Sequence, residues 1–349
     1  MVGIVGWDIG AANVKAAGIM SGQEICGPER IASRPFEIWR DKYRLPAMLQ
    51  EVFNAVVPDE PPHTMAVTMT AELSDIFATK REGVLFVLEQ MENTFPASTI
   101  YVFDIAGTFV PLEEARTHPL DFAATNWLAS AQWLARKIPD CLIVDVGSTS
   151  TDIIPVLDGR VTVSGWTDTA RLYSGELVFT GALRTNLAAI VRSVPVAGGL
   201  CRVASEYFAI SGDVHLILGN LKPQDYLCTT PDGRPPSVES ARRRLARLVC
   251  ADTEMLSAAE IDELARFICA RQVRQIRDGM EQVISRLPRL RNHPVLLIGS
   301  GAFLGVEAAE SLGLNMLEFP GEWEEKKLAV APSLAVAHLL AEYLKTERA

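Results

Sequence analysis

Along the first half of the chain, short runs of apolar residues alternate with segments whose apolar residues recur every three to four positions. Short apolar runs are typical of buried strands, and the longer spacing is typical of amphipathic helices. The pattern predicts strands at 65–70 and 99–104, and helices at 46–57, 80–92 and 126–137. Strands that alternate with helices favour a layered α/β fold.

The second half begins less regularly. A glycine-containing, loop-rich stretch follows Val163, and residues 201–220 include a segment that can form a helix. The stretch 223–236 contains a Pro-Asp-Gly turn and predicts an exposed loop. One long helical region is then expected from Val238 to about Arg286.

Near the C-terminus, a buried strand is predicted from Pro294, and it ends in Gly299-Ser300-Gly301. Residues 306–312 then have helical spacing, and a last helix is expected at about 332–345. A glycine-rich turn between a strand and a helix N-terminus is favourable for a phosphate or nucleotide. The alternative is that these glycines only allow close packing of strand and helix.

Two strand–turn–strand segments, Val5–Gly22 and Leu142–Gly159, share one pattern 137 residues apart. Each has an apolar strand, an Asp, a turn of small residues, a second apolar strand, and a Ser-Gly or Asp-Gly turn. The positions that match without a gap are Asp8 with Asp145, Gly10 with Gly147, and Gly22 with Gly159.

Turns of this kind are suited to an anion. We expect their glycines to take positive φ and to leave backbone N–H groups unshielded, so that each turn folds around a phosphate. Asp8 and Asp145 can hold a hydrated divalent cation, expected to be Mg²⁺, against that anion. Two such hairpins facing each other would form a phosphate clamp, whereas in the alternative interpretation their aspartates only cap turns. The expected phosphate-binding residues are Gly10, Ala11, Asn13, Gly147, Ser148, Thr149, Ser150, Thr151, Gly299, Ser300 and Gly301.

Composition narrows the class of protein. A length of 349 residues with 48% hydrophobic residues predicts two domains with substantial cores. A formal charge of −10 argues against nucleic-acid and anionic-membrane partners, because phosphates are met by clustered Lys and Arg. The run Arg242-Arg243-Arg244 is interpreted as a solvated helix face. No apolar run is long enough to span a membrane, and we expect a cytoplasmic enzyme of small-molecule substrates, with a homo-oligomer left open.

The remaining reactive side chains form no recognisable motif. The six cysteines lack Cys-x-x-Cys spacing, so we expect reduced, mostly buried thiols and no zinc site. Met1 to Trp7 lack a basic segment and a cleavage site, and are interpreted as a strand and not a signal peptide. His215 and His338 lie in apolar stretches and are interpreted as structural.

The two hairpins, followed along the chain by the Gly-x-Gly turn, resemble the motifs of the sugar kinase, heat-shock protein and actin superfamily. Longer segments are similar to the hydantoinase/oxoprolinase-related group, and in particular to its members linked to tetrahydromethanopterin-dependent one-carbon transfer and methanofuran biosynthesis. The resemblance spans the chain. The segments that carry it are Asp8–Lys15, Met69–Asp75, Ala124–Trp127, Gly175–Thr185 and Ser205–Ala209.

The resemblance implies two actin-like (ribonuclease H-like) lobes with a cleft between them. We expect the first lobe at 1–136, completed by a C-terminal helix within 330–349, and the second at 137–329. In one respect the chain departs from the group, whose first turn usually has a second glycine where this chain has Ala11. If that position needed positive φ, alanine would cost on the order of 1 kcal/mol.

For function, the resemblance implies a transferase that joins a tyramine- or tyrosine-type phenol to an aminomethyl-furan with a diphosphate leaving group. The product is an aryl ether, and pyrophosphate departs. Such a site needs a cation and donors for the diphosphate, an apolar wall around the furfuryl carbon, and a base for the phenol proton. In this interpretation Mg²⁺ is the expected cofactor, and ATP can bind but is not required.

Individual residues take roles within this hypothesis. Asp8 and Asp145 would orient Mg²⁺ or its waters, and Lys15 would reach a phosphate oxygen unless it is merely solvated. Asp152 is the candidate base or second metal contact, with turn capping as the alternative. Together Asp8, Lys15, Asp145 and Asp152 are the expected catalytic residues.

Five residues are candidates for substrate binding. Glu72 and Asp75 can bind an ammonium group, or they can simply complement a helix dipole. Arg184 can pair with a carboxylate or phosphate, and Tyr207, like Trp127, can stack on an aromatic ring, although packing is the alternative for each. The full set is Glu72, Asp75, Asn126, Arg184 and Tyr207.

Three other functions stay open at this point. An ATP-dependent small-molecule kinase would use the same hairpins, with ATP at Gly299–Gly301. An ATP-dependent amidohydrolase of the oxoprolinase type is a second alternative, although the chain is short for it. The third is a nucleotide-binding scaffold without turnover. Fold alone does not separate them.

Overall fold

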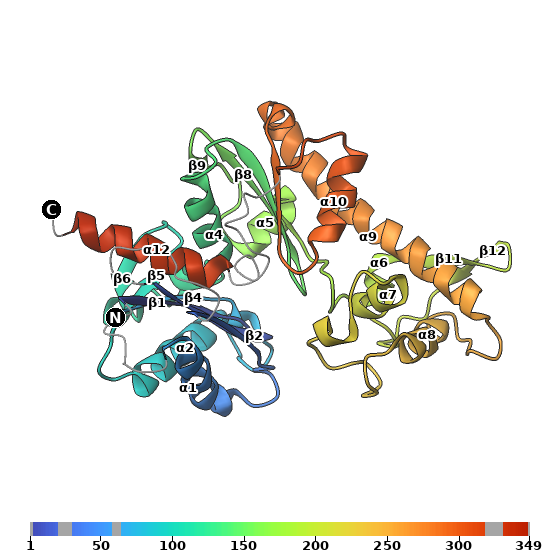
Figure 1. Cartoon of the computed structure of the whole chain (residues 1–349), viewed down its shortest axis with the longest axis horizontal. Coiled ribbons are helices and arrows are strands. Elements are labelled where there is room, and N and C mark those ends of the chain that lie inside the picture. Colours follow the sequence, from blue (N-terminus) through green and yellow to red (C-terminus); the bar gives the residue numbers. More distant parts are fainter. Residues whose placement is uncertain (1–2, 20–29, 58–63, 318–330, 348–349) are drawn as a thin grey trace. The chain divides into compact units, whose positions relative to one another are not determined.

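The computed structural model describes residues 3–19, 30–57, 64–317 and 331–347. The chain forms two compact units (Figure 1). The first comprises Met1–Pro139, Val156–Val161 and Phe319–Ala349, and the second comprises Asp140–Pro155 and Thr162–Glu318. The Ser-Gly turn expected at Gly22, together with Cys26, lies outside the described residues.

The first unit contains a six-stranded sheet with the order β3-β2-β1-β4-β5-β6. Strands β1, β2 and β3 form an antiparallel meander. Strands β4 and β5 run parallel to β1. This order and these directions are those of a ribonuclease H-like sheet. The strands are β1 Ile4–Ile9, β2 Asn13–Ile19, β3 Ile31–Pro35, β4 Thr64–Met69, β5 Thr99–Phe103 and β6 Phe109–Pro111.

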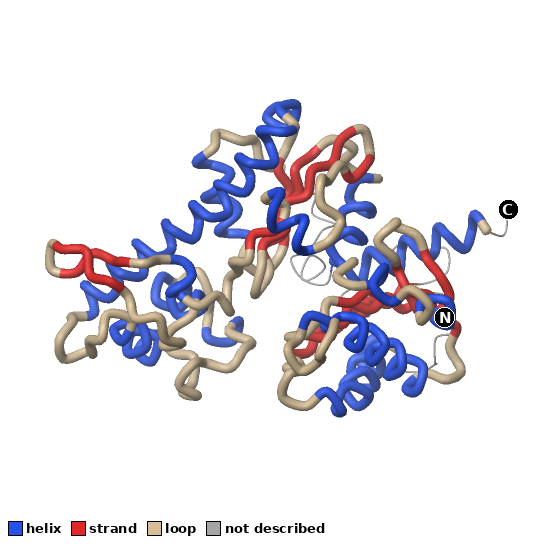
Figure 2. Tube along the Cα trace, turned by 180° about the vertical axis from the view of Figure 1, so that it is seen from behind, coloured by secondary structure: helices blue, strands red, loops and turns tan. Residues whose placement is uncertain are grey.

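Helices cover both faces of this sheet (Figures 1 and 2). One face packs Val5, Trp7 and Ile9 of β1 against apolar residues of α1 and α2. On the other face α12 approaches so closely that a Cβ at Gly6 would lie 1.9 Å from the Ser333 carbonyl oxygen. The helical segments are η2 Lys42–Arg44, α1 Leu45–Val56, η3 Ala71–Leu73, α2 Lys80–Thr94, α3 Leu112–Ala115, η4 Pro119–Phe122, α4 Asn126–Ala135 and α12 Ala331–Thr346.

The second hairpin belongs to another sheet, with the order β10-β8-β7-β13 and with β9 paired to β8. Its strand β13 runs parallel to β7, and β10 and β9 are antiparallel to β8. A separate two-stranded hairpin, β11–β12, lies along the same unit. The strands are β7 Cys141–Val146, β8 Thr151–Leu157, β9 Arg160–Val161, β10 Leu177–Val178, β11 Ser193–Val196, β12 Gly199–Arg202 and β13 Val295–Ile298.

Helices make up much of the rest of the second unit, and the long α9 packs against α7, α8 and α10 (Figure 1). The helical segments are α5 Asp168–Ser174, α6 Leu187–Ile190, α7 Ser211–Leu218, η5 Pro223–Asp225, α8 Val238–Arg247, α9 Ala258–Arg286, η6 Pro288–Asn292 and α10 Ala302–Ser311.

Most of the predicted elements are confirmed, including the alternating strands and helices of the first half and the helix after the Gly-x-Gly turn. The long helical region expected from Val238 to about Arg286 is present as two helices, because the chain breaks between α8 and α9. At the break Cys250 takes a φ of +57°. Ser257 then begins α9 with a capping box, in which its hydroxyl and the Glu260 carboxylate bond to each other's backbone N–H.

The arginine run on α8 is not the solvated face that we expected. Arg244 is fully buried, and its guanidinium lies 2.6 Å from Asp213 and 2.9 Å from Asp232. Arg242 pairs with Asp262, and Arg243 pairs with Glu239 on the helix surface. A charge run therefore supplies the internal ion pair that links α8 to α7.

The predictions for the cysteines and for the two histidines have different outcomes. Among the described cysteines none is in a disulfide, and Cys141 and Cys269 are buried, but the other three are partly or fully exposed. The prediction of mostly buried thiols is therefore wrong. His215 is buried with hydrogen-bond partners, and His338 stacks on Trp133, so the structural interpretation of both is confirmed. No helix in the described part of the chain is long and apolar enough to cross a membrane.

Candidate functional site

The turn between β7 and β8 is the centre of the candidate site. Gly147 N–H donates to the Ser150 carbonyl at 2.9 Å and closes the turn. Residues 147–150 are all partly exposed, and the Ser148 and Thr149 hydroxyls lie 3.5 Å apart, the long limit of a hydrogen bond. Weakly engaged hydroxyls on an accessible turn can still bond to an anionic ligand.

A second segment, residues 181–184, holds this turn from one side, and we call it the strap. Ala182 N–H donates to the Gly147 carbonyl at 2.9 Å, and Leu183 and Arg184 N–H both donate to the Ser148 carbonyl. A Cβ at Gly181 would lie 2.5 Å from the Thr149 nitrogen. Gly181 is therefore required for close approach, and the strap fixes the shape of the turn.

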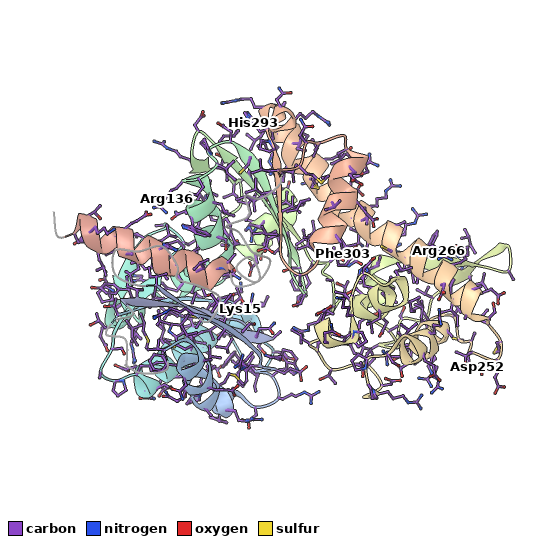
Figure 3. The ribbon with its side chains drawn as sticks, in the orientation of Figure 1. Lys15, Arg136, Asp252, Arg266, His293 and Phe303 are labelled. Atoms are coloured by element: carbon purple, nitrogen blue, oxygen red, sulfur yellow. The ribbon has the colours of Figure 1, made fainter. Side chains whose placement is uncertain are left out.

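Buried polar residues hold the strap in turn. Gln272 of α9 donates its amide to the Gly181 carbonyl at 2.8 Å and to the Thr180 hydroxyl at 3.0 Å. Its carbonyl lies 3.0 Å from His215 Nε2, and the imidazole packs edge-on against Phe303 at the start of α10. Phe303 is labelled in Figure 3. The Ser211 hydroxyl also donates to the Gly181 carbonyl. These contacts link the strap to three helices.

The Gly-x-Gly turn lies against the same edge of the sheet. Gly301 N–H donates to the Val146 carbonyl at 2.8 Å, and α10 begins at the next residue. Gly299 has a φ of +88°, and a Cβ there would lie 2.4 Å from Asp145 Oδ1. The structure therefore brings together the second hairpin turn, Asp145 and the N-terminus of α10 within one unit.

Asp152 follows the turn on β8 and is tied to a buried arginine. Arg171 is 1% exposed and donates to Asp152 Oδ1 at 2.8 Å. Burial raises the pKa of Asp152, while Arg171 opposes the shift and Asp168 adds to it. Asp152, on the strand β8 that follows the turn, is therefore the counter-ion of Arg171.

The turn between β1 and β2 repeats the geometry of the second hairpin. Gly10 N–H donates to the Asn13 carbonyl at 2.9 Å, as Gly147 does to Ser150. Asp8 is opposite Lys15 in the strand register, and their charged groups lie 3.5 Å apart. Lys15 is labelled in Figure 3. The duplicated hairpin seen in the sequence is confirmed in both units.

Asp8 is 3% exposed, and its Oδ1 has no hydrogen-bond partner. Burial raises the pKa of this carboxyl, and the Lys15 ammonium opposes the shift. An orphaned buried carboxylate oxygen is costly unless a ligand satisfies it. The environment of Asp8 therefore fits a cation or a water-bridged ligand at the first turn.

The expectation that the turn glycines need positive φ is wrong. Gly10 and Gly147 both lie outside that region, and so does Ala11. Space explains Gly10, because a Cβ there would lie 3.1 Å from the Asn13 oxygen and 3.3 Å from Thr70 Oγ1. Ala11 carries no backbone strain of this kind, so its departure from the group's second glycine leaves the turn intact.

Two more of the segments that carry the resemblance meet the first hairpin in the first unit. Thr70 N–H donates to the Ile9 carbonyl, and Glu72 follows within a short turn, 2% exposed. The Thr68 hydroxyl lies 2.8 Å from that of Thr125, beside Asn126. Glu72 and Asn126 therefore belong to the segments around the ends of β1 and β4.

The other predicted substrate residues have varied surroundings. Asp75 is exposed, and the Asn126 side chain accepts from the Trp127 N–H at 2.8 Å. Arg184 belongs to the strap, and its Nη1 lies 3.5 Å from Thr149 Oγ1. Tyr207 is 54% exposed in a loop whose end, Ala209, accepts from Leu187 N–H. Trp127 is 4% exposed and belongs to the core, as its packing alternative proposed.

Sequence reasoning missed several residues that shape the second turn. Gln272 and Ser211 hold the strap, but they lie 91 and 30 positions from the glycine that they contact. Phe179, 56% exposed directly after β10, borders the strap and was not singled out either. Its position inside the resembling segment Gly175–Thr185 was the one available signal.

Metal binding by protein groups alone is not indicated. In the described residues no three His, Cys, Asp or Glu side chains are grouped to hold an ion. Mg²⁺ commonly uses one or two carboxylates and completes its shell with water and substrate phosphates. Asp145, next to an accessible turn rich in hydroxyls, fits that mode of binding.

The two sheets, with their matching hairpin turns, define an α/β protein of the actin-like class. A model of the hydantoinase/oxoprolinase family matches residues 63–343. The chain belongs to this family. The family predicted from the quoted segments is thereby confirmed.

Two relatives and one solved structure illustrate the similarity. The chain is 35% identical over 98% of both lengths to a Methanocaldococcus jannaschii protein named (4-{4-[2-(gamma-L-glutamylamino)ethyl]phenoxymethyl}furan-2-yl)methanamine synthase. A Methanococcus vannielii protein of the same name is 31% identical, over 62% of this chain and 98% of its own. Nucleotide-free acetone carboxylase superposes with a TM-score of 0.56 and 10% identity, over 96% of this chain and 70% of its own, which supports the fold alone.

Proposed function

We propose that this chain is a transferase of methanofuran-type cofactor biosynthesis, which joins a tyramine-type phenol to an aminomethyl-furan and forms an aryl ether. One observation carries the proposal: the 35% identity, over 98% of both chains, to a synthase whose name describes this ether. The compound in that name contains a γ-glutamylated aminoethyl-phenoxy group joined through a methylene to a furan methanamine. The chain is therefore an enzyme that makes this bond or a close analogue.

The leaving group is proposed to be diphosphate, bound at the turn 147–150. Accessible hydroxyls and a neighbouring guanidinium, that of Arg184, support this assignment. The N-terminus of α10, close to Asp145, adds a favourable field for an anion. These features would stabilise the charge that develops on the departing diphosphate.

The reaction is a substitution at the furfuryl methylene. The phenol oxygen forms a C–O bond to that carbon, the C–O bond to diphosphate breaks, and its electron pair leaves with the diphosphate. Asp152 is proposed to accept the phenol proton. Its burial favours a proton on the carboxylate, and Arg171 at 2.8 Å keeps the side chain oriented.

Mg²⁺ is proposed at Asp145, and Asp8 is the proposed carboxylate ligand of the first hairpin. The ion would neutralise charge on the diphosphate. The orphaned Oδ1 of Asp8 supports its assignment. Lys15 is the proposed phosphate contact of the first hairpin, and ATP is not required in this proposal. The cleft between lobes, a cytoplasmic location and the predicted partners stay predictions.

The experiment that tests the function follows ether and pyrophosphate together by mass spectrometry. The purified chain is incubated with Mg²⁺, the aminomethyl-furfuryl diphosphate and γ-glutamyl-tyramine, with and without ATP. We expect ether and pyrophosphate in equal amounts in both arms. No ether in either arm, with ADP formed in the ATP arm, would replace the proposal with a kinase or an ATP-driven amidohydrolase, and ATP binding without product would favour a scaffold.

Asp145→Asn provides a sharper test of the second turn. We expect the variant to lose ether formation by at least about a hundredfold, because it removes a negative charge that the proposed cation needs. Circular dichroism should match wild type. Asp158→Asn is the matched control, since Asp158 lies at the other end of β8 with a φ of +52°, which asparagine tolerates. Near-normal activity of Asp145→Asn would remove the proposed metal role.

A further inference from the structure

Phe179 is an exposed aromatic residue next to the candidate diphosphate turn. It follows β10 and precedes the strap, and it is 56% exposed. A single exposed aromatic is ordinary on a protein surface. Phe179 differs from such a residue because hydrogen bonds tie its neighbours to β8 and to α9.

Hydrogen bonds hold the backbone on both sides of Phe179. Thr180 N–H donates to the Val178 carbonyl at 2.8 Å, which closes a three-residue turn around Phe179. Val178 pairs with Thr151 in the sheet, and the Thr151 hydroxyl donates to the Thr180 carbonyl at 2.8 Å. Gln272 also donates to the Thr180 hydroxyl. A ligand that contacts Phe179 therefore loses little binding free energy to ordering of the backbone there.

The place of Phe179 follows from the neighbouring residues. Thr180 is 1% exposed, whereas the ring of Phe179 is accessible on the outside of the unit. Val178, directly before it, pairs with Thr151 at the end of the turn. Two residues after it, a Cβ at Gly181 would lie 2.5 Å from the Thr149 nitrogen. The backbone of Phe179 therefore lies beside the turn that would hold diphosphate.

The chemistry of the proposed substrate gives this ring a partner. In a furfuryl diphosphate, one methylene separates the phosphate ester from the furan ring. A furan whose diphosphate lies on the turn must consequently lie within reach of the residues that border the turn. An aromatic face favours contact with a second ring, and it also favours positive charge that develops on the furfuryl carbon when diphosphate departs.

We propose that Phe179 is the aromatic contact for the furan ring of the diphosphate substrate and selects for an aromatic group next to the diphosphate. The identity of the ring rests on the proposed function. The location of the contact rests on the hydrogen bonds around Phe179 and on the close approach of Gly181 to the turn.

The test compares two ligands on the full chain by calorimetry with Mg²⁺ and without the phenol. The probes are inorganic pyrophosphate and the aminomethyl-furfuryl diphosphate. Phe179→Ala should weaken binding of the furfuryl compound about five- to tenfold, the size of one lost aromatic contact, and change pyrophosphate binding less than about twofold. Phe179→Trp should bind like wild type. Tyr173→Ala is the matched control, because Tyr173 is an aromatic residue of the same unit that is 88% exposed.

Each other result decides against the contact. Equal weakening of both ligands would make Phe179 a support of the turn, and unchanged affinities would remove it from the site. A wild-type chain that binds the furfuryl compound no more tightly than pyrophosphate would overturn the proposal as well. Ether formation is measured separately on wild type. Ring-dependent binding through Phe179 without ether would contradict the proposed reaction and leave the aromatic contact standing.

Discussion

Buried polar side chains in the second unit act as supports for the turn, and His215 shows this at the scale of one residue. The imidazole contacts Gln272 and the side chain of Asn220, and Gln272 in turn bonds to the strap. Burial lowers the pKa of His215 to about 4. The folded protein therefore keeps this histidine neutral at pH values where an unfolded chain would bind a proton.

The pH dependence of stability follows from that difference. Between about pH 6.5 and 4 the unfolded state binds more protons than the folded state, so the contribution of His215 is complete above pH 6.5 and is lost as pH falls toward 4. The difference in pKa corresponds to on the order of 3 kcal/mol in the unfolding free energy. Urea unfolding at pH 7 and pH 4.5 measures it.

Two variants isolate this contribution. His215→Gln should be less stable than wild type at pH 7 but should lose less unfolding free energy on acidification. His118→Gln, which changes an exposed histidine, should keep the wild-type pH dependence. An unchanged pH dependence in His215→Gln would contradict the assignment of the effect to this residue.

At the scale of elements, the strap is what gives the second turn its shape. The Cβ that an alanine would add at Gly181 would lie within 2.7 Å of Thr149 and Gly147 backbone atoms. Backbone atoms on both sides have little room to move, since the strap also carries hydrogen bonds to Ser148 and Gln272. The turn and the strap therefore form one unit of structure made from two distant stretches of sequence.

Gly181→Ala should consequently displace the turn. We expect a loss of about 1–3 kcal/mol in unfolding free energy from overpacking, and weaker pyrophosphate binding than in wild type. Gly199→Ala is the control, because the nearest atom to an added Cβ there is 3.8 Å away. Calorimetric titration with pyrophosphate and urea unfolding give the two quantities. If Gly181→Ala bound pyrophosphate like wild type, the strap would have no part in anion binding.

Sequence patterns predicted these elements well, and the limits have physical causes. Apolar spacing and repeated turns located both hairpins and the Gly-x-Gly turn. The burial of Arg244 was missed because its partners Asp213 and Asp232 lie on other segments. The spacing of residues along one helix does not reveal partners on another segment. Gln272 was missed for a related reason, since its role depends on the Gly181 carbonyl, 91 positions away.

At the scale of the whole molecule, the chain crosses between units more than once. The first unit combines Met1–Pro139 with Phe319–Ala349, so its two ends come from the two ends of the chain. The contact between β1 and α12 joins them, and Gly6 allows it, since its missing Cβ would meet Ser333 and Ala337. The stability of the first unit thus depends on residues that are more than 300 positions apart.

Gly6→Ala tests this dependence. An added Cβ 1.9 Å from the Ser333 oxygen should force α12 away from β1, lower the thermal midpoint of the first unit and expose α12 to proteolysis. Differential scanning calorimetry and limited proteolysis, read by mass spectrometry, provide the measurements. The Gly199→Ala variant serves again as control. Wild-type protease resistance of α12 in Gly6→Ala would show that its packing on β1 does not depend on this glycine.

The distance between β1 and α12 along the chain has a consequence during synthesis. β1 leaves the ribosome more than 300 residues ahead of α12, the helix that covers one face of its sheet. Nascent chains consequently carry a partly uncovered sheet until α12 emerges, after the second unit is complete in sequence. A stop codon or frameshift between the second unit and α12 would therefore damage the first unit, although it leaves the six strands intact.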